Sequence, residues 1–503
     1  MTKEKNKIIL VIILILISLI TLVGSSYALL TKSFKSKKLS MEVGTLKIDF
    51  AEGNAINMAN AAPMTDSNGL KSTPYTFTIT NGGDINAYYT VSNEEELANT
   101  LDTSYLRMKL TGSDGYDSGI KTVKELGTET YKLIDDTLLE TGKSVTYELR
   151  MWISQDAGND IQDKIYKSKI VVNGTSNKLP LATDKILAKA NPENLDYNSA
   201  TDAQKKEMWT FTHEATEQTT ALTDYRYIGA DPNNYVKFND ELWRIIGVFD
   251  TDDGTGKVEK RLKIIRNESI GNYSWDNKDT TTGAETAYGK NEWTDARLNY
   301  LLNPGHESET NGGSLYWNRK SGTCYKGQNN STTSCDFTST GLTDTAKSMI
   351  GDAKWYLGGS STYNDVTPPM FYTRERGTTV YSGHSTSWIG KVGLMYPSDY
   401  GYATSGGSST NRNSCLAKEL YNWDSSGYSD CKNNDWMYNS NIWQWTMSPR
   451  ADGSNDVFIV INAGYVSYNR AGNTYAGRPV VYLKSTIKVI SGSGTTSSPY
   501  ILG

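Results

Sequence analysis

Few residues in this 503-residue sequence have the type and spacing that catalysis requires. Only three histidines are present, and His384, in SGHSTSW, is the best placed for a general base because hydroxyl-bearing residues flank it. A serine hydrolase needs a serine and an acid beside that imidazole, and nothing in the spacing brings them together. The motifs GxSxG, HExxH and the P-loop are absent from the sequence. We therefore expect no enzymatic activity and interpret His384 as a loop or core residue.

The distribution of aromatic residues indicates a binding surface instead. Eleven of the twelve tryptophans lie beyond residue 200. Aromatic side chains that stand among Asn, Ser and Asp are suited to a polar surface on which sugar rings stack, and also to contacts with a protein partner. We predict this role for four residues: Trp423, Tyr428, Trp436 and Tyr438. Trp443 and Trp445 alternate on one predicted strand face, and we interpret both as core residues.

The charged residues favour neither a cofactor nor nucleic acid. The formal charge of −5 lacks the basic footprint of a nucleic-acid-binding protein. Two acidic loops offer carboxylate oxygens of the kind that Ca²⁺ prefers. No EF-hand loop or lectin calcium signature accompanies these residues, which are Asp250, Asp252 and Asp253 in one loop and Asp452 and Asp456 in the other. We expect no cofactor and assign no metal ligand, and we keep Ca²⁺ as the alternative.

The four cysteines form two close pairs in the sequence, Cys324 with Cys335 and Cys415 with Cys431. Four cysteines allow three pairings, of which the local one is the simplest, and four free thiols are the alternative. The spacing is not CxxC, which argues against a zinc site. Closing each Ser/Asn/Gly-rich segment with a disulfide would contribute ~2–3 kcal/mol. Disulfides persist in oxidising compartments, so this interpretation predicts export.

The N-terminus has the features of an export signal. Lysines precede the apolar run Ile8–Val23, and small residues at 26 and 28 predict cleavage between Ala28 and Leu29. Counted on to Leu30, the same run is long enough to be a retained membrane anchor, which is the alternative. Four lysines follow the run and favour a cytoplasmic position for the rest of the chain, but the cysteines argue against that orientation. We expect the protein on the extracellular face of the membrane or secreted into a matrix.

Residues 38–175 have the period-two pattern of half-buried strands. TPYTFTIT places Tyr75, Phe77 and Ile79 on one face, and VTYELRMWIS repeats the pattern later. NGGD at 81–84 predicts a hairpin turn, and SNEEELANTL at 92–101 predicts a short helix. Strands at this spacing favour a sandwich or jelly-roll.

The motifs VGTLKIDF, YTFTITNGGDINAYYTV, TGKSVTYELRMWIS and KIVVNGT resemble the TasA/camelysin group of exported bacterial proteins. The resemblance covers roughly residues 20–175 and implies a jelly-roll fold, processing by a signal peptidase and, in some members, assembly into fibres. In fibre-forming members the freed N-terminal segment adds as a strand to the next subunit. Here that segment would begin at Leu29, and its lysines disfavour strand addition.

Residues 176–224 are predicted to be a linker, and we interpret His213 within it as solvated. Residues 225–503 form a second predicted unit. NYVKFNDELWRIIGVF predicts a hairpin that turns at Asn239-Asp240. Helices are predicted at 293–303, with Thr294 as N-cap, and at 343–358, and strands at 392–401, 443–450, 456–468 and 478–491. Arg478 is expected to brace the sheet.

The order of YVKFNDELWRIIGVF, GLMYPSDYG, WTMSPR, AGRPVVYLKSTIKV and GSGTTSSPYIL resembles a surface-protein domain of Gram-positive gut bacteria. That domain is related in plan to the C-type-lectin and formylglycine-generating-enzyme fold. The resemblance implies helices that flank a curled sheet. The cysteines do not match the enzyme's site, so its activity is not expected here.

The sequence as a whole predicts a mainly β fold with some α: a jelly-roll-like β-sandwich followed by an α+β C-type-lectin-like domain. The expected segments are a signal or anchor at 1–28, a basic segment at 29–37, the sandwich at 38–175, the linker at 176–224 and the lectin-like domain at 225–503. We expect a non-catalytic surface or matrix protein that displays an adhesin-like domain. The expected partners are a glycan or protein outside the cell, the membrane if the N-terminal helix is uncleaved, and further copies in a self-assembly. The alternatives are a glycan or cell-wall hydrolase and a structural biofilm-matrix subunit.

Overall fold

The computed structural model describes residues 46–52, 62–95, 99–127, 130–158, 161–162, 164–213, 221–278 and 285–503. The predicted signal, its cleavage site at Ala28 and Leu29, and the basic segment 29–37 lie outside these residues. Across the described ranges, no helix is both long and apolar enough to cross a membrane. Strand accounts for 37% and helix for 15% of the described residues, which confirms the mainly β fold class.

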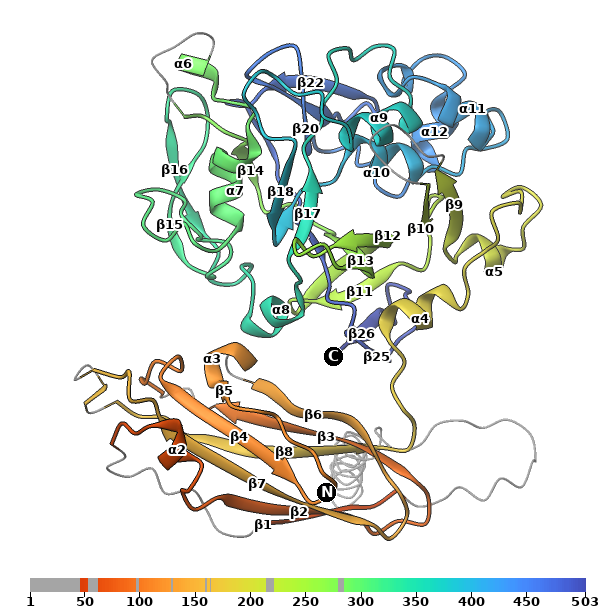
Figure 1. Cartoon of the computed structure of the whole chain (residues 1–503). Coiled ribbons are helices and arrows are strands. Elements are labelled where there is room, and N and C mark those ends of the chain that lie inside the picture. The colour runs from red at the N-terminus through yellow and green to blue at the C-terminus, as the bar shows by residue number, and fades with distance from the viewer. Residues whose placement is uncertain are drawn as a thin grey trace, which may run out of the picture.

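The N-terminal unit, drawn below the larger unit in Figure 1, contains a five-stranded and a three-stranded antiparallel sheet. The buried side chains of both sheets form one core between them. The first sheet has the order β1 (Ile48–Glu52), β2 (Tyr75–Asn81), β7 (Ser144–Ile153), β4 (Leu106–Gly112) and β5 (Lys121–Thr122). The second has the order β6 (Thr130–Leu139), β3 (Ala87–Glu95) and β8 (Ser168–Thr175). The short helices here are α2 (Asp66–Gly69) and α3 (Val123–Leu126).

The predicted alternation in β2 and β7 is confirmed, but the hairpin at NGGD is wrong. Phe77 and Ile79 are buried, while Thr76, Thr78 and Thr80 are half-buried. The chain leaves β2 in one sheet and enters β3 in the other, so residues 81–86 cross between the sheets. The buried Asn81 side chain fixes this crossing, because its Nδ2 donates to the carbonyls of Ile85 and Leu139.

The helix predicted at 92–101 is also wrong. Ser92–Glu95 is the end of β3, which pairs with β6 on one side and with β8 on the other. Strand pairing on both sides therefore outweighs the helix propensity of the glutamates.

The C-terminal unit is built on a nine-stranded sheet. Its main path runs β19 (Val392–Gly393), β24 (Val480–Tyr482), β13 (Val258–Arg266), β12 (Glu241–Asp252), β11 (Tyr235–Phe238), β26 (Tyr500–Leu502) and β25 (Val489–Ser491). Strand β10 (Leu222–Arg226) pairs with β12 and with β9 (Trp209–His213). The predicted β11–β12 hairpin is confirmed, and Asn239 and Asp240 both have positive φ, as a tight hairpin turn requires.

A second sheet of five strands packs in the same unit. Its order is β14 (Asn272–Ser274), β23 (Thr474–Ala476), β20 (Gln444–Pro449), β21 (Asp456–Val460) and β22 (Val466–Arg470). The β21–β22 hairpin turns at Ala463-Gly464 as predicted. Two separate hairpins are β15 (Ser321–Tyr325) with β16 (Thr332–Asp336), and β17 (Ala353–Tyr356) with β18 (Ser387–Gly390).

Short helices complete the chain. They are α4 (Ala182–Leu187), α5 (Asp202–Lys205), α6 (Glu285–Tyr288), η2 (Trp293–Asp295), α7 (Arg297–Leu302), α8 (Asp344–Met349), α9 (Pro368–Glu375), α10 (Pro397–Tyr402), α11 (Arg412–Ala417), η3 (Leu420–Asn422) and α12 (Ser429–Asn433).

Four predicted elements of this unit end or begin elsewhere. The strand expected at 478–491 is two strands, β24 and β25, which lie at different positions in the large sheet. The helix expected at 343–358 is α8 followed by strand β17, and the strand expected at 392–401 is β19 followed by α10. Helix α10 begins at Pro397 because proline suits a first helical turn and Asp399 accepts the N–H of Tyr396. The N-cap role expected of Thr294 belongs to Glu292, whose side chain accepts the N–H of Thr294.

The segment expected to be a linker is packed into the C-terminal unit. Ala182 and Ile186 of α4 are buried in its core, and the N–H of Ala182 donates to the carbonyl of Ile487. Strands β9 and β10 extend the large sheet. Between the two units, the Lys488 ammonium lies 2.8 Å from a carboxylate oxygen of Asp135 and 3.3 Å from one of Asp136.

Candidate functional site

Two of the four aromatic residues predicted to bind ligand lie in the core, so this part of the prediction is wrong. Trp423 is completely buried and Trp436 is 6% exposed. Trp423 packs against Tyr400 with 5.4 Å between ring centroids. The Trp436 indole donates to the carbonyl of Tyr227, and the Arg244 guanidinium lies 4.5 Å from its ring. The polar neighbours in the sequence form turns, while the indoles point inward.

Tyr428 is half-buried at the start of α12, and the Lys418 ammonium lies 4.8 Å from its ring centroid. Tyr428 caps α12, whereas Tyr438 bonds to Asn462 in the turn between β21 and β22. The four predicted residues therefore do not form one surface, and Tyr438 is the member that leads to a candidate site.

Tyr438 and Trp443 meet at Asn462, in the turn between β21 and β22. The Tyr438 hydroxyl donates to the carbonyl of Asn462, and the Trp443 indole donates to its side-chain oxygen, both at 2.9 Å. Trp443 is 37% exposed. Its ring stacks on Tyr475 with 5.3 Å between centroids and 28° between planes. An exposed indole is thus held in a fixed orientation by an aromatic ring and an amide.

More amides surround the outer end of Tyr475. The Asn469 side chain donates to the Tyr475 hydroxyl at 2.6 Å, and Asn473 donates to the side-chain oxygen of Asn469 at 2.6 Å. Gln328 in turn donates to Asn473 at 3.1 Å. We call this set the Trp443 platform: Tyr438, Trp443, Asn462, Asn469, Asn473 and Tyr475. The platform combines an aromatic surface with amide donors and acceptors and has no charged member.

The expectation that Trp443 and Trp445 are both core residues is half right. Trp445 is 1% exposed and donates its indole N–H to the carbonyl of Tyr273. Both tryptophans contact Tyr475, as their alternation predicts. Trp443 lies one residue before β20 begins, at the end of this central strand, and is exposed there.

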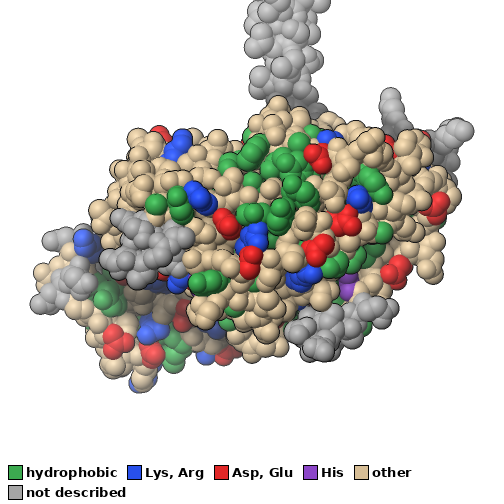
Figure 2. Space-filling view, turned by 90° about the horizontal axis from the view of Figure 1, so that it is seen from above, with side chains coloured by type: hydrophobic (Ala, Val, Ile, Leu, Met, Phe, Trp, Pro, Cys, Tyr) green, Lys and Arg blue, Asp and Glu red, His purple; other side chains and the backbone are tan. Residues whose placement is uncertain are grey.

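A second aromatic group lies beyond the β21–β22 turn. Tyr465 packs edge-to-face on Tyr421, Tyr421 on Tyr363, and Tyr363 on Tyr468, with centroids 4.8–5.4 Å apart. The Arg450 guanidinium lies 4.0 Å from the Tyr468 ring. Figure 2 looks onto the end of the molecule opposite the sandwich and shows hydrophobic side chains gathered there among charged ones.

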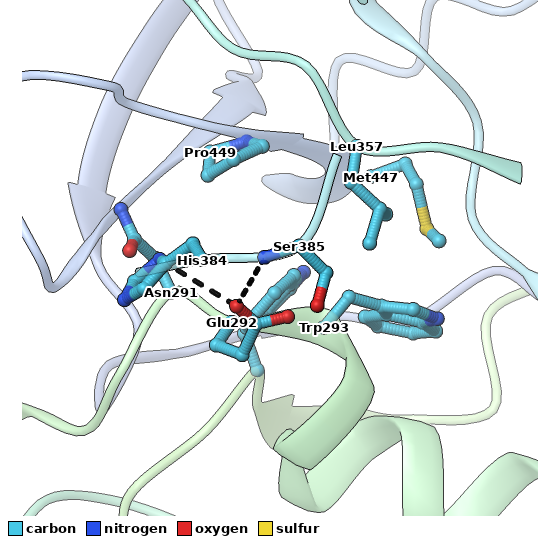
Figure 3. Close-up of a pocket in the computed structure, with 9 residues that line it drawn as sticks. Asn291, Glu292, Trp293, Leu357, His384, Ser385, Met447 and Pro449 are labelled. Carbon is cyan, nitrogen blue, oxygen red and sulfur yellow. Dashed lines mark hydrogen bonds and ion pairs between the residues drawn. The ribbon is translucent and has the colours of Figure 1, made fainter. Parts of the chain in front are cut away.

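His384 lies in a small cavity rather than at an open catalytic site (Figure 3). Its Nδ1 is 4.0 Å from Glu292 Oε2, which also accepts the N–H of Ser385 at 2.8 Å. Both side chains are buried, so His384 is a core residue as expected. The space open to the centre of a water-sized sphere is about 10 Å³, enough for about one water molecule. The cavity is lined by Trp275, Asn291, Glu292, Trp293, Leu357, His384, Ser385, Met447 and Pro449.

The acidic loops considered for Ca²⁺ are occupied by other contacts. Asp250 pairs with Lys260 at 3.0 Å, and Asp452 pairs with Arg450. Asp252 and Asp253 accept backbone N–H groups of their own turn. Within the described ranges, no three His, Cys, Asp or Glu side chains are grouped to hold a metal.

The predicted local pairing of the cysteines is confirmed. Cys324 is bonded to Cys335 across the β15–β16 hairpin, and Cys415 of α11 is bonded to Cys431 of α12. Two disulfides fit an extracellular or secreted protein.

A buried ionic network, which the sequence did not reveal, lies at the centre of the large sheet. The Arg226 guanidinium lies 3.0 Å from carboxylates of both Asp224 and Asp399, and Lys263 lies 2.5 Å from the other oxygen of Asp399. All four side chains are at most 4% exposed. Burial lowers the pKa of Lys263 to about 8, although Asp399 opposes this shift. For Asp224, burial acts to raise the pKa, but Arg226 and His213 outweigh it and the pKa is lowered.

His213 belongs to this network, so its expected solvation is wrong. Its side chain is 10% exposed, its ring stacks on Tyr372 at 3.7 Å, and its Nε2 lies 3.0 Å from Asp224. Pairing of β9 with β10 brings the histidine to this carboxylate. Burial lowers the pKa of His213 despite the Asp224 carboxylate. Arg478 braces the sheet as expected, because it donates to Gln444 and to the carbonyl of Arg266.

Glu375 gives the network a testable pH dependence. Its carboxyl is fully buried against Ser398, and burial raises its pKa from 4.5 to about 7, against the Arg376 charge and the Ser398 hydrogen bonds. A raised carboxyl pKa contributes stability that is present below the unfolded value and is lost as the pH rises through the folded value. In Glu375→Gln, which cannot ionise, we expect a smaller loss of stability between about pH 5 and about pH 8 than in the wild type. Urea unfolding followed by tryptophan fluorescence at both pH values measures this difference, and equal losses in the two proteins would contradict it.

Comparisons with known proteins do not assign this chain to a family. No protein-family model matches the chain, and no curated protein matches it. A solved structure titled "AvmM Catalyzes Macrocyclization in Alchivemycin A Biosynthesis" aligns with 10% identity over 26% of this chain and 89% of its own. Its TM-score of 0.16 is too low to support an argument about fold or function.

Proposed function

We propose that this chain is an exported protein whose C-terminal unit binds a glycan at the Trp443 platform. The observation that carries the proposal is the exposed Trp443 indole, fixed on Tyr475 and surrounded by the amides of Asn462, Asn469 and Asn473. A sugar ring presents an apolar C–H face that stacks on an aromatic ring, and its hydroxyls pair with amides. The six platform residues are uncharged and their amides and hydroxyls suit a hydroxyl-rich ligand, while the Lys432 ammonium lies 5.9 Å from the Tyr438 ring centroid.

The remainder of the chain supports display outside the cell. The two disulfides fit an oxidising compartment. The N-terminal sandwich resembles the TasA/camelysin group in its strand motifs, and we propose that it holds the binding unit at the membrane or in a matrix. The C-terminal unit, by its own resemblance, is proposed to be C-type-lectin-like.

Trp443→Ala is the variant that tests the proposal. We expect it to lose at least about tenfold in affinity for the glycans that the wild type captures on an array, because truncation removes the stacking surface. Tyr381→Ala is the matched control, since Tyr381 is 36% exposed on a loop outside the platform and its loss should leave the array pattern unchanged. Array patterns that are the same for wild type and Trp443→Ala would refute the platform.

The same samples separate the rival functions. Captured glycans recovered intact support binding without turnover, whereas shortened sugars would identify a glycan hydrolase. Protein beginning at Leu29 that forms ordered filaments and captures no glycan would identify a structural matrix subunit instead.

A further inference from the structure

The ion pair between Lys263 of β13 and Asp399 of α10 has unusual surroundings. Both side chains are 1% exposed, and Lys263 Nζ lies 2.5 Å from Asp399 Oδ2. An ammonium has three N–H donors, yet Asp399 is the one hydrogen-bond acceptor that Lys263 contacts in the described part of the chain. Aromatic rings occupy the rest of its surroundings, with centroids 4.4–5.8 Å from Nζ: Phe249, Trp355, Tyr396 and Tyr482.

The Asp399 carboxyl is held in a fixed orientation. Arg226 donates to Oδ1 at 3.0 Å, while the N–H of Tyr396 donates to Oδ2 at 2.9 Å. The oxygen that faces Lys263 is therefore Oδ2, and Oδ1 points to a guanidinium that withdraws electron density from the carboxyl carbon. This arrangement places an amine, a carboxyl and a donor for a developing oxyanion in one water-poor site.

We propose that Lys263 and Asp399 condense to form an intramolecular amide bond. The bond between Nζ and Cγ forms, and the bond between Cγ and Oδ2 breaks. The Lys263 ammonium first passes one proton to Oδ2, which leaves a neutral amine facing a neutral carboxyl. After Nζ attacks Cγ, a second proton moves from Nζ to Oδ2, and Oδ2 leaves as water while the third proton stays on the amide nitrogen. The step needs neither an oxidant nor a co-reactant. Arg226 stabilises the negative charge that develops on Oδ1 in the tetrahedral intermediate.

The energetics of burial favour this product. Two opposite ions without water are replaced by one neutral amide, whose single N–H suits surroundings with few acceptors. The lowered pKa of Lys263, about 8 through burial, leaves part of the amine neutral and nucleophilic near neutral pH. Arg226 and Arg376 remain beside the bond, with the Asp224 carboxylate and with Glu375, whose raised pKa of about 7 leaves it partly protonated near neutral pH.

The bond would join strand β13 to helix α10, which lie 136 residues apart in the sequence. The two disulfides span only 11 and 16 residues. The amide would therefore close a much longer loop than either disulfide, and it would resist reduction.

Mass spectrometry of the full chain, reduced and alkylated, tests the proposal. We expect the wild type to be lighter than its sequence by one water, and a protease digest to contain a branched peptide in which the Lys263 and Asp399 segments are joined. Lys263→Met should restore the sequence mass. Lys260→Met is the matched control, because Lys260 lies on the same strand but pairs with Asp250, and it should keep the water loss.

A wild-type protein at its full sequence mass, with the two peptides separate, would overturn the proposal. So would a water loss that joins no peptides, as a succinimide at Asp253-Gly254 or Asp452-Gly453 would give. The wild-type digest decides the question even where Lys263→Met fails to fold. This result does not depend on glycan binding, so the amide bond and the glycan site can be confirmed or refuted independently.

Discussion

Replacing Arg226 with methionine is expected to unfold the C-terminal unit under conditions in which the wild type is stable. Arg226 lies between Asp224 and Asp399, and its side chain is 2% exposed. Removing a buried cation deprives both carboxylates of one of their partners, and breaking a buried ion pair in this way costs about 3–5 kcal/mol. That is a large part of the 5–15 kcal/mol by which domains are typically stable.

Tryptophan fluorescence reports this transition selectively, because Trp152 is the one tryptophan before residue 200. We expect the thermal midpoint of Arg226→Met to fall well below that of the wild type. Arg470→Met is the control: Arg470 is exposed, and its loss should change stability by less than about 0.5 kcal/mol. Equal midpoints for Arg226→Met and Arg470→Met would show that the ionic network does not hold the unit together.

Removing either disulfide is expected to have the next largest effect. The Cys415–Cys431 bond closes a loop of 16 residues, and the chain-entropy model gives about 3 kcal/mol for a loop of that length. The paired substitution Cys415→Ser with Cys431→Ser should therefore lower the free energy of unfolding by about this amount. Because closure entropy grows only slowly with loop length, the Cys324 and Cys335 pair, 11 residues apart, should behave alike.

Urea unfolding of the two double variants, beside wild type with and without a reductant, measures the effect. Reduced wild type should resemble a protein that lacks both disulfides. An unfolding midpoint that does not change on reduction would mean that the disulfides contribute nothing to the folded unit, and it would weaken the argument for an oxidising compartment.

The parts of the fold that the sequence predicted well depend on local patterns. Strict alternation of apolar and polar residues identified β2 and β7, and Asn239-Asp240 identified the β11–β12 turn. Both signals depend only on residues that are close together in the sequence. The errors depend on distant partners. The NGGD segment has the composition of a hairpin turn, but Asn81 binds the carbonyl of Leu139, which lies 58 residues away.

The candidate site was predictable only in part for the same reason. An abundance of aromatic residues pointed to the region of the candidate site and to Tyr438, but not to which rings turn inward. Trp436 is buried because Arg244 and Tyr227, about 200 residues earlier, cover it. Trp443 lies one residue before β20 begins and is exposed there. In the ionic network, Asp224 and Arg226 are two residues apart and therefore lie on the same face of a strand. The same spacing is typical of charged residues on a solvent-exposed face, so the sequence did not reveal that this pair is buried.

The most direct test of the central claim is a titration of the best array glycan into the full-length protein and into Trp443→Ala, by isothermal calorimetry. We expect saturable binding by the wild type and at least about tenfold weaker binding by the variant, equivalent to about 1.4 kcal/mol. Identical affinities in two equally folded proteins would contradict it and would move the ligand away from the Trp443 platform.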